Sequence, residues 1–527
     1  MSSLTVRIAF LSGEEHGITV PIHATVDDLR ATAEMEMRKS LGKLISASGT
    51  VLPASSTLAQ EDIKDGDVIT AVFQEVTVAA ATSAFAVIRS DATVVAWGIP
   101  QVGGDCSAVQ EQLQHVQSIQ ATWDAFAALR TDGTVVTWGD PFGGGDSSSV
   151  QSQLCNVCHV QSTARAFAAI KADGSVVTWG SRANGGDCSA VRDQLYSVQQ
   201  IQSTRMAFAA LREDGSVVTW GESASGGDSS AVRDELQEGV LSIYAQDHDF
   251  PGVMSFPGFA AIKAGGRFVF CGGGYAAPRG LIHSGLDDIA HLQVVGGRWA
   301  AASKNGHLAL SLEPIRGDRC LLVPDCASSL AGCPECLAVL QKDGTVQFWG
   351  HCAPNWLRNE LSNVVRVRMA GGFGAALRSD GSVVLWEFTE RGAISCASAK
   401  VHRQLTDVKD IQANPCAFAF LRRDGSVVAW GDDTCGGNSA AVQPHLKEVV
   451  SIQASYAAFA AIRRDGSVVT WGDPRNGGES SLVQEQLGRR VANDNDKQAA
   501  FRAKQAGAHN RVKSQVLKKP SKKYSKK

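Results

Sequence analysis

One string recurs along this chain at a fixed distance, and it limits the possible folds more than any other feature. The string is D-G-[ST]-V-V-x-W-G, and successive early copies lie 41 residues apart. Its tryptophan stands at Trp97, Trp138, Trp179, Trp220, Trp349, Trp386, Trp430 and Trp471. Two degenerate copies fill the gap and place Cys271 and Ser311 in the tryptophan column. Such a period predicts ten similar units between about Val76 and Leu487, stacked as an array.

The unit from Val116 to Leu154 contains three short apolar runs separated by turn residues. Asp132-Gly133 stands between the second and third runs and predicts a tight hairpin, because glycine accepts the positive φ that such turns require. In the second run, Phe126 and Ala128 alternate with Ala127 and Leu129, so both faces are apolar, as in a sheet covered on both sides. The G-G-D-S segment that follows predicts a turn and a capped helical turn between units.

Three strand-length runs per unit of about 40 residues are typical of a β-propeller, and the 3.6-residue period of helical repeats is absent. A β-solenoid is the alternative. The sequence predicts an all-β repeat array of about ten short blade units. It leaves open whether these close one large ring or form seven blades with three extra units.

The string x-A-F-A-A-L-R-x-D-G-x-V-V-x-W-G-x-x-x-x-G-G-D resembles the repeat of the regulator of chromosome condensation family. The short period looks more like the compact repeat of the bacterial β-lactamase inhibitor protein II. Gly-Gly-Asp replaces the family's Gly-Gln-Leu-Gly, and there are ten units where seven usually close a ring. The resemblance implies a propeller that binds other proteins.

The first 75 residues have a different pattern, with strands at LTVRIAF and GITVPI, an amphipathic helix from Thr25 to Ser40, and further strands at KLISASGTVL and DGDVITAV. This ββαββ order resembles a small α+β ubiquitin-like β-grasp domain. The resemblance implies an apolar partner-binding patch at Leu11, Ile45 and Val72; the alternative is that these are ordinary sheet residues. Thr25 is expected to cap the helix.

The charge of the chain is unevenly distributed. Residues 489–527 hold 13 Lys and Arg against Asp494 and Asp496, which predicts a basic, disordered tail over 488–527. Lys518, Lys519, Lys522 and Lys523 suit nuclear import or weak contact with nucleic-acid phosphates, or serve solubility alone. With no export signal or long apolar stretch, a cytoplasmic or nuclear location and no membrane partner are expected.

The cysteines offer two metal or cofactor patterns, and neither is favoured. Cys155, Cys158 and His159 match the C-x-x-C-H spacing of haem attachment, but they fall at the start of a repeat strand. A zinc tetrad would need the irregularly spaced set Cys320, Cys326, Cys333 and Cys336. We therefore expect no cofactor, no metal and no enzymatic activity.

One insertion interrupts the regular array. The spacing from Trp220 to Cys271 is ten residues longer than its neighbours, and the excess carries five acidic, aromatic or histidine side chains, namely Asp247, His248, Asp249, Phe250 and Phe256. An inserted loop of this composition is a candidate partner site, with relaxed drift as the alternative. Because units five to eight have lost the consensus, a specific binding surface is expected there.

Three functions remain. The first is a non-catalytic protein-interaction scaffold, linked to the ubiquitin pathway through its N-terminal domain. The second, implied by the family resemblance, is guanine-nucleotide exchange on a small GTPase, or regulation of one at chromatin. The third is a component related to HECT ubiquitin ligases but without their catalytic domain, since we expect that domain to need far more than the roughly 40 residues after the array.

Overall fold

The computed structural model describes most of the chain. The described residues are 3–10, 14–37, 41–53, 56–73, 76–246, 257–272, 289–295, 298–303, 308–311, 320–323, 327–333, 336–350, 355–370, 373–389, 392–394 and 399–487.

The N-terminal module is a four-stranded sheet with one helix. Its elements are β1 (Ser3–Phe10), β2 (Glu15–Pro21), α1 (Val26–Met37), β3 (Leu41–Ile45) and β4 (Val68–Phe73). The sheet order is β2-β1-β4-β3, with β1 antiparallel to β2 and parallel to β4. The predicted ββαββ order of elements is confirmed.

Helix α1 begins as predicted, at a cap made by Thr25. The Asp28 N–H donates to Thr25 Oγ1 at 3.1 Å, and the Thr25 N–H donates to Asp28 Oδ2 at 2.9 Å. The second of these bonds lowers the pKa of Asp28. Leu29 and Ala33 are fully buried in the same core as Val6, which fixes the helix on one face of the sheet.

The described residues form ten further sheets that follow in chain order, and we number their units one to ten. The strands of units one to four are β5 (Thr77–Ala80), β6 (Ala84–Ile88), β7 (Val94–Gly98), β8 (Val116–Ala121), β9 (Ala125–Arg130), β10 (Val135–Gly139), β11 (Val157–Ser162), β12 (Ala166–Lys171), β13 (Val176–Gly180), β14 (Val198–Ser203), β15 (Ala207–Arg212) and β16 (Val217–Gly221).

Units five to eight contain β17 (Val240–Gln246), β18 (Gly258–Lys263), β19 (Phe268–Gly272), β20 (Ile289–Val295), β21 (Arg298–Ser303), β22 (Leu308–Ser311), β23 (Cys320–Val323), β24 (Ala327–Cys333), β25 (Cys336–Gln341), β26 (Val346–Gly350), α3 (Asn355–Glu360), β27 (Val364–Ala370), β28 (Phe373–Arg378), β29 (Val383–Thr389), β30 (Gly392–Ile394) and α4 (Ala399–Gln404). Units nine and ten contain β31 (Val408–Ala413), β32 (Ala417–Arg422), β33 (Val427–Gly431), β34 (Val449–Ala454), β35 (Ala458–Arg463), β36 (Val468–Gly472) and α5 (Gln484–Leu487).

Each regular unit is an antiparallel sheet whose middle strand is its second. In unit two, β9 pairs with β8 on one side and β10 on the other, and every residue of β9 except its last is buried. Gly133 in the hairpin has φ 77°. The predicted hairpin is therefore confirmed, and so is the prediction that the second strand is buried on both faces of its sheet.

Neighbouring units are joined by one repeated contact between a tryptophan and a glycine turn. The Trp138 indole N–H of unit two donates to the carbonyl of Gly103 in unit one at 3.0 Å, and Phe126 stacks on Trp138 with ring centroids 5.2 Å apart. Gly103 has φ 97°, and an added Cβ would lie 2.5 Å from the Phe126 ring. Only glycine fits this turn. The same bond joins Trp179 to Gly144, Trp220 to Gly185 and Trp471 to Gly436.

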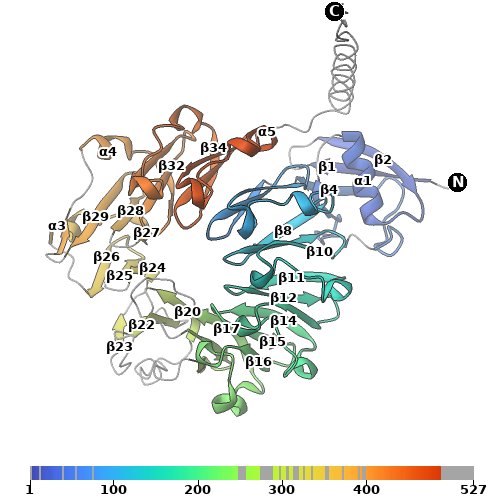
Figure 1. Ribbon diagram of the computed structural model, residues 1–527, viewed down its shortest axis with the longest axis horizontal. Coiled ribbons are helices and arrows are strands. Elements are labelled where there is room, and N and C mark those ends of the chain that lie inside the picture. The colour runs from blue at the N-terminus through green and yellow to red at the C-terminus, as the bar shows by residue number, and fades with distance from the viewer. Residues whose placement is uncertain are drawn as a thin grey trace, which may run out of the picture.

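The same contact closes the array. Trp97 of unit one donates to the Gly477 carbonyl of unit ten at 3.0 Å, and Ser83 Oγ donates to Asn476 Oδ1 at 3.0 Å. Phe85 is packed in one core with Ala458 and Leu487. First strands also contact first strands from each unit to the next, and β34 contacts β5. Figure 1 shows the sheets following one another around a ring. All ten units therefore belong to one closed ring, the arrangement of a β-propeller.

The ring has two distinct faces, which we name by their turns. The turn face carries the loops between first and second strands together with the Gly-Gly turns that follow third strands. The hairpin face carries the Asp-Gly hairpins. Backbone bonds tie consecutive loops on the turn face, with Thr82 N–H donating to the Trp123 carbonyl, Trp123 N–H to Ala164 and Ala164 N–H to Arg205.

Candidate interaction surface

A patch of aromatic and charged side chains lies on the turn face at units two to four. We call it the turn-face patch, and it consists of Trp123, Asp124, Phe142, Arg165 and Arg205. These residues occupy loop positions whose identity differs from unit to unit. The loops themselves are held by the neighbouring Thr122, Thr163 and Thr204, whose hydroxyl groups donate hydrogen bonds to backbone carbonyls. The side chains at the variable positions are therefore not needed to hold the loops.

Trp123 and Arg205 form the centre of the turn-face patch. The guanidinium carbon of Arg205 lies 4.1 Å from the centroid of the Trp123 ring, although the two residues belong to units two and four. Ala164 occupies the same loop position in unit three and is hydrogen-bonded through its backbone to both Trp123 and Arg205. Such a cation–π contact holds both side chains in place on the surface.

Asp124 and Arg165 form an ion pair beside this stack. Arg165 Nη2 lies 3.1 Å from Asp124 Oδ2, with side-chain exposures of 47% and 19%. Burial raises the pKa of Asp124, an effect that Arg165 opposes and the nearby Asp140 charge reinforces. The ion pair therefore places one negative and one positive group at defined positions at the edge of the turn-face patch.

Phe142 is the most exposed member of the turn-face patch. It lies in the short 3₁₀ turn Pro141–Gly143, and its N–H donates to Asp140 Oδ1 at 3.2 Å. The side chain is 80% exposed. The next residue, Gly143, lies against Asp124, since an added Cβ would be 3.3 Å from the Asp124 Cβ. An exposed phenylalanine on a hydrogen-bonded turn, together with tryptophan and arginine on the same face, has the composition of a protein-binding hot spot.

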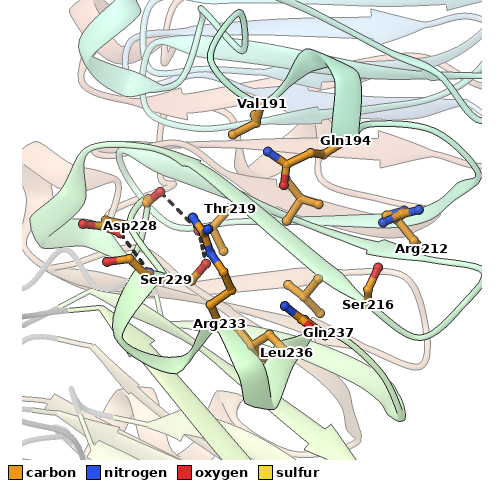
Figure 2. A pocket seen from close by; sticks show the side chains of 14 residues that line it. Val191, Gln194, Arg212, Ser216, Thr219, Asp228, Ser229, Arg233, Leu236 and Gln237 are labelled. Carbon is orange, nitrogen blue, oxygen red and sulfur yellow. Dashed lines mark hydrogen bonds between the residues drawn. The ribbon is translucent and has the colours of Figure 1, made fainter.

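The chain also has a cavity of about 540 Å³ where the connectors after units three and four flank strands β15 and β16. Figure 2 shows Val191 and Gln194 on one side, Arg212 and Ser216 at one end, and Asp228 with Arg233 on the other side. The Ser230 N–H donates to Asp228 Oδ1 at 2.9 Å, which lowers the pKa of Asp228.

This cavity repeats around the ring. A cavity of about 460 Å³ occurs in unit ten at equivalent residues, with Glu479 in place of Asp228 and Gln484 in place of Arg233. In several units the glutamine at this position donates to a strand carbonyl, as Gln151 does to Val135 at 3.1 Å. A cavity that recurs with structural side chains is a product of the repeat and does not mark a single active site.

The Gly-Gly-Asp segments form turns, as predicted, but the cap residues of the 3₁₀ turns that follow them make no side-chain cap bond, so the predicted cap is not observed. Asp105, Asp146, Asp187 and Asp228 each accept a hydrogen bond from the N–H two residues later, at 2.8 to 2.9 Å. This backbone bond is the first cause of the lowered pKa of each of these carboxyl groups. The predicted short helical turn is present as a 3₁₀ turn after the segment, such as Gln151–Gln153 in unit two.

Few of the predicted partner residues lie within the described chain. Ile45 ends β3, is half-buried, and pairs with Thr70 and with Val51. Val72 lies in β4, with its side chain outside the described residues, as is all of Leu11. The loop residues Asp247, His248, Asp249, Phe250 and Phe256 and the tail residues Lys518, Lys519, Lys522 and Lys523 also lie outside the described residues. These sites stay predictions.

The cysteine patterns can be placed in part. Cys158 and His159 are exposed on β11, and Cys155 is exposed just before it. Of the second set, Cys320, Cys333 and Cys336 lie in strands whose side chains are not described at these positions, and Cys326 is outside the described residues. Within the described part of the chain, no three His, Cys, Asp or Glu side chains form a metal-binding group. No described helix is long and apolar enough to cross a membrane.

Sequence reasoning missed the turn-face patch. Trp123 is one of three tryptophans outside the repeat column, with Trp299 and Trp356, and this was a usable signal. Its pairing with Arg205 depends on the stacking of units, which a single repeat does not reveal.

The N-terminal module contacts the ring on the other face. Arg30 of α1 is 7% exposed, pairs with Asp27, and donates from Nη2 to Thr131 Oγ1 at 2.8 Å. Thr131 precedes the hairpin glycine of unit two. The module and the turn-face patch therefore lie on opposite faces of the ring.

Comparisons with known proteins gave structural neighbours. No protein-family model matches the sequence, and no curated protein matches it. Among solved structures, Prp20p from Saccharomyces cerevisiae, studied with its binding to Gsp1p and histones, is similar at 14% identity and a TM-score of 0.29, covering 53% of this chain and 73% of that one.

Human WBSCR16 is similar at 12% identity and a TM-score of 0.30, covering 57% of this chain and 85% of that one. The computationally designed Ika8 protein is similar at 13% identity and a TM-score of 0.29, covering 68% and 97%. The assignment of a propeller ring rests on the strand pairing and closure of this chain itself.

Proposed function

We propose that the protein is a non-catalytic scaffold that binds a protein partner on its turn face, through the patch of units two to four. The observation that carries the proposal is the Trp123–Arg205 stack on the turn face, with Phe142 exposed in a turn of the same face. Tryptophan and arginine are among the residue types most enriched at positions that dominate binding energy.

The ring holds these side chains in place before a partner arrives. The loops of Trp123, Ala164 and Arg205 are tied by backbone hydrogen bonds, and each loop is anchored in its own unit by a threonine. A partner therefore loses little affinity to ordering of this surface. The opposite face contacts the N-terminal module, so both can be engaged at once.

Affinity capture with the full chain tests the proposal. Trp123→Ala and Phe142→Ala are each expected to reduce binding of a specific partner roughly tenfold or more, the loss typical of a central hot-spot residue. Leu482→Ala is the matched control, because Leu482 is 97% exposed and lies in the connector of unit ten, away from the patch. Partners retained equally by all three variants would rule out this surface.

We further propose that the N-terminal module supplies a second binding surface, linked to the ubiquitin pathway. Its β2-β1-β4-β3 order with one crossing helix supports this extension. Leu44 belongs to the core beneath α1, so Ile45 belongs to the opposite face of the sheet. Helix α1 contacts the ring through Arg30, which leaves that opposite face available.

Mutation of Ile45 to Ala tests this extension. Ubiquitin-pathway proteins bound by the full chain are expected to be lost in Ile45→Ala and also on deletion of residues 1–75. Their retention in both variants would contradict the link while leaving the turn-face proposal intact.

Guanine-nucleotide exchange on a small GTPase is the second candidate, and it rests on the repeat's family resemblance. Release of a fluorescent guanine nucleotide from a panel of small GTPases separates the two functions. Acceleration by the full chain would establish exchange, and equal rates with and without the chain would exclude it for that panel.

A further inference from the structure

Unit nine carries two cysteines at a pair of positions that face each other in the repeat. Cys416 immediately precedes β32, and Cys435 ends the 3₁₀ turn Asp433–Cys435. The equivalent residues of unit two are Asp124 and Gly143, where a Cβ added to the glycine lies 3.3 Å from the aspartate Cβ. The Cβ atoms of disulfides lie about 3.5 to 4.5 Å apart. The repeat therefore places these two cysteines at close to bonding geometry.

The contacts of unit nine confirm the register. In unit two, Thr122 Oγ1 donates to the Gly143 carbonyl at 3.0 Å. In unit nine, Asn414 Nδ2 donates to the Cys435 carbonyl at 2.7 Å, and the Cys416 N–H donates to Asn414 Oδ1 at 3.1 Å. The same loop is thus anchored to the same turn, which places the Cys416 and Cys435 side chains next to each other.

Both thiols are accessible to small molecules. Cys416 and Cys435 are half-buried, whereas Cys106, Cys188 and Cys271 are buried. Burial, the Cys435 thiol and the Asp432 charge raise the pKa of Cys416 to about 11, so Cys416 is protonated at neutral pH. A dithiol in which one member stays protonated reacts first through the other.

We propose that Cys416 and Cys435 are a reversible disulfide site that is oxidised by a small-molecule disulfide such as oxidised glutathione. The Cys435 thiolate attacks one sulfur of the reagent and releases the other half as a thiolate. Cys416 then gives up its proton and attacks Cys435 Sγ, which forms the protein disulfide and expels the second thiolate. The two electrons lost by the protein reduce one disulfide to two thiols.

The disulfide would fix the joint between units nine and ten. Gly436 follows Cys435, and its carbonyl accepts the Trp471 indole N–H of unit ten at 2.9 Å. A disulfide between Cys435 and Cys416, which lies in the β31–β32 loop, would therefore restrain the turn whose Gly436 carbonyl binds Trp471. The site is independent of the turn-face patch, which lies in units two to four.

Peptide mapping of the full native chain tests the site. The chain is equilibrated in defined mixtures of reduced and oxidised glutathione, quenched with acid, unfolded, alkylated and digested with trypsin. A linked pair of peptides containing Cys416 and Cys435 is expected in the oxidised mixtures, lighter than its reduced parts by two hydrogen atoms, and reverting in excess thiol. Buried Cys106 and Cys188 are the internal controls and are expected to remain alkylated.

The single variants Cys416→Ser and Cys435→Ser complete the test. In Cys416→Ser, glutathione is expected to remain attached to Cys435, because the resolving thiol is gone. The proposal is overturned if the wild-type chain shows both cysteines alkylated in every mixture, or if it accumulates glutathione on Cys435 without the linked peptides. Because the wild-type readout is direct, this conclusion does not depend on folding of the variants.

Discussion

Units two and eight differ in the residue that lies opposite the repeat tryptophan on the second strand. In unit two, Phe126 lies opposite Trp138 and stacks on it, and the indole reaches back to Gly103 of unit one. In unit eight, Gly374 lies opposite Trp386. The Trp386 ring occupies the space of the missing phenylalanine, is fully buried, and meets Phe348 of unit seven edge-on at 5.8 Å.

The two units also differ in their connectors. Unit two continues from its third strand into the 3₁₀ turn Pro141–Gly143, whereas unit eight adds the strand β30 and helix α4. Both nevertheless bury their tryptophan against a neighbour. In both units an aromatic side chain fills the joint to the neighbouring unit, and the Phe–Trp–Gly arrangement is one way to fill it.

The largest effect is expected from filling the glycine turn of the regular joint. Gly144 has φ 95°, and an added Cβ would lie 2.7 Å from Phe167. Gly144→Val should reduce the free energy of unfolding by roughly 4 kcal/mol, the sum of backbone strain and overpacking. Gly265→Val is the control, since Gly265 has φ 86° but open space around it, and should cost only about 1 to 2 kcal/mol. Urea denaturation of both variants measures the difference, and equal losses would contradict the packing role.

The second-largest loss of stability is expected from a substitution at Gly374, opposite Trp386 in unit eight. A Cβ at Gly374 would overlap the Trp386 ring, although Gly374 is not among the glycines with positive φ. Gly374→Ala should therefore cost about 2 kcal/mol through overpacking alone. A loss below the error of denaturant titration would show that Trp386 can move aside.

Removal of the indole donor should have a smaller effect. Trp138→Phe deletes the bond to Gly103 and part of a buried ring, and should reduce stability by about 2 kcal/mol or slightly less. Hydrogen exchange of the amides around Gly103 should increase in this variant. Unchanged exchange there would argue against a joint held by this bond.

The smallest effect is expected from pH. Asp146, Asp187 and Asp228 have pKa values lowered from 3.8 by backbone N–H groups of their turns. Their contribution to stability is present above that value and is lost as pH falls below it, because the unfolded chain takes up protons first. The triple variant with Asn at all three positions should show a shallower fall in melting temperature between about pH 5 and 3. An equally steep fall would assign acid sensitivity to other groups.

Local chemistry made much of the fold predictable. Asp132-Gly133 specifies a hairpin through two adjacent residues, and Thr25 specifies a helix start through one hydrogen bond. Ring closure was not predictable, because Trp97 makes with Gly477 the same contact that Trp138 makes with Gly103. A periodic sequence is the same in an open and in a closed array. The turn-face patch likewise depends on Arg205 reaching Trp123 across a whole unit, which no short-range pattern encodes.

Closure of the ten units into one ring is tested most directly at Trp97. The Trp97 indole donates to Gly477, its partner 380 positions away in the chain. In a closed ring, Trp97→Phe should reduce stability as much as Trp138→Phe, by about 2 kcal/mol or slightly less. Denaturant titration of the two variants side by side gives the answer. Equal losses are predicted, and a Trp97→Phe variant as stable as the wild type would show that units one and ten do not meet.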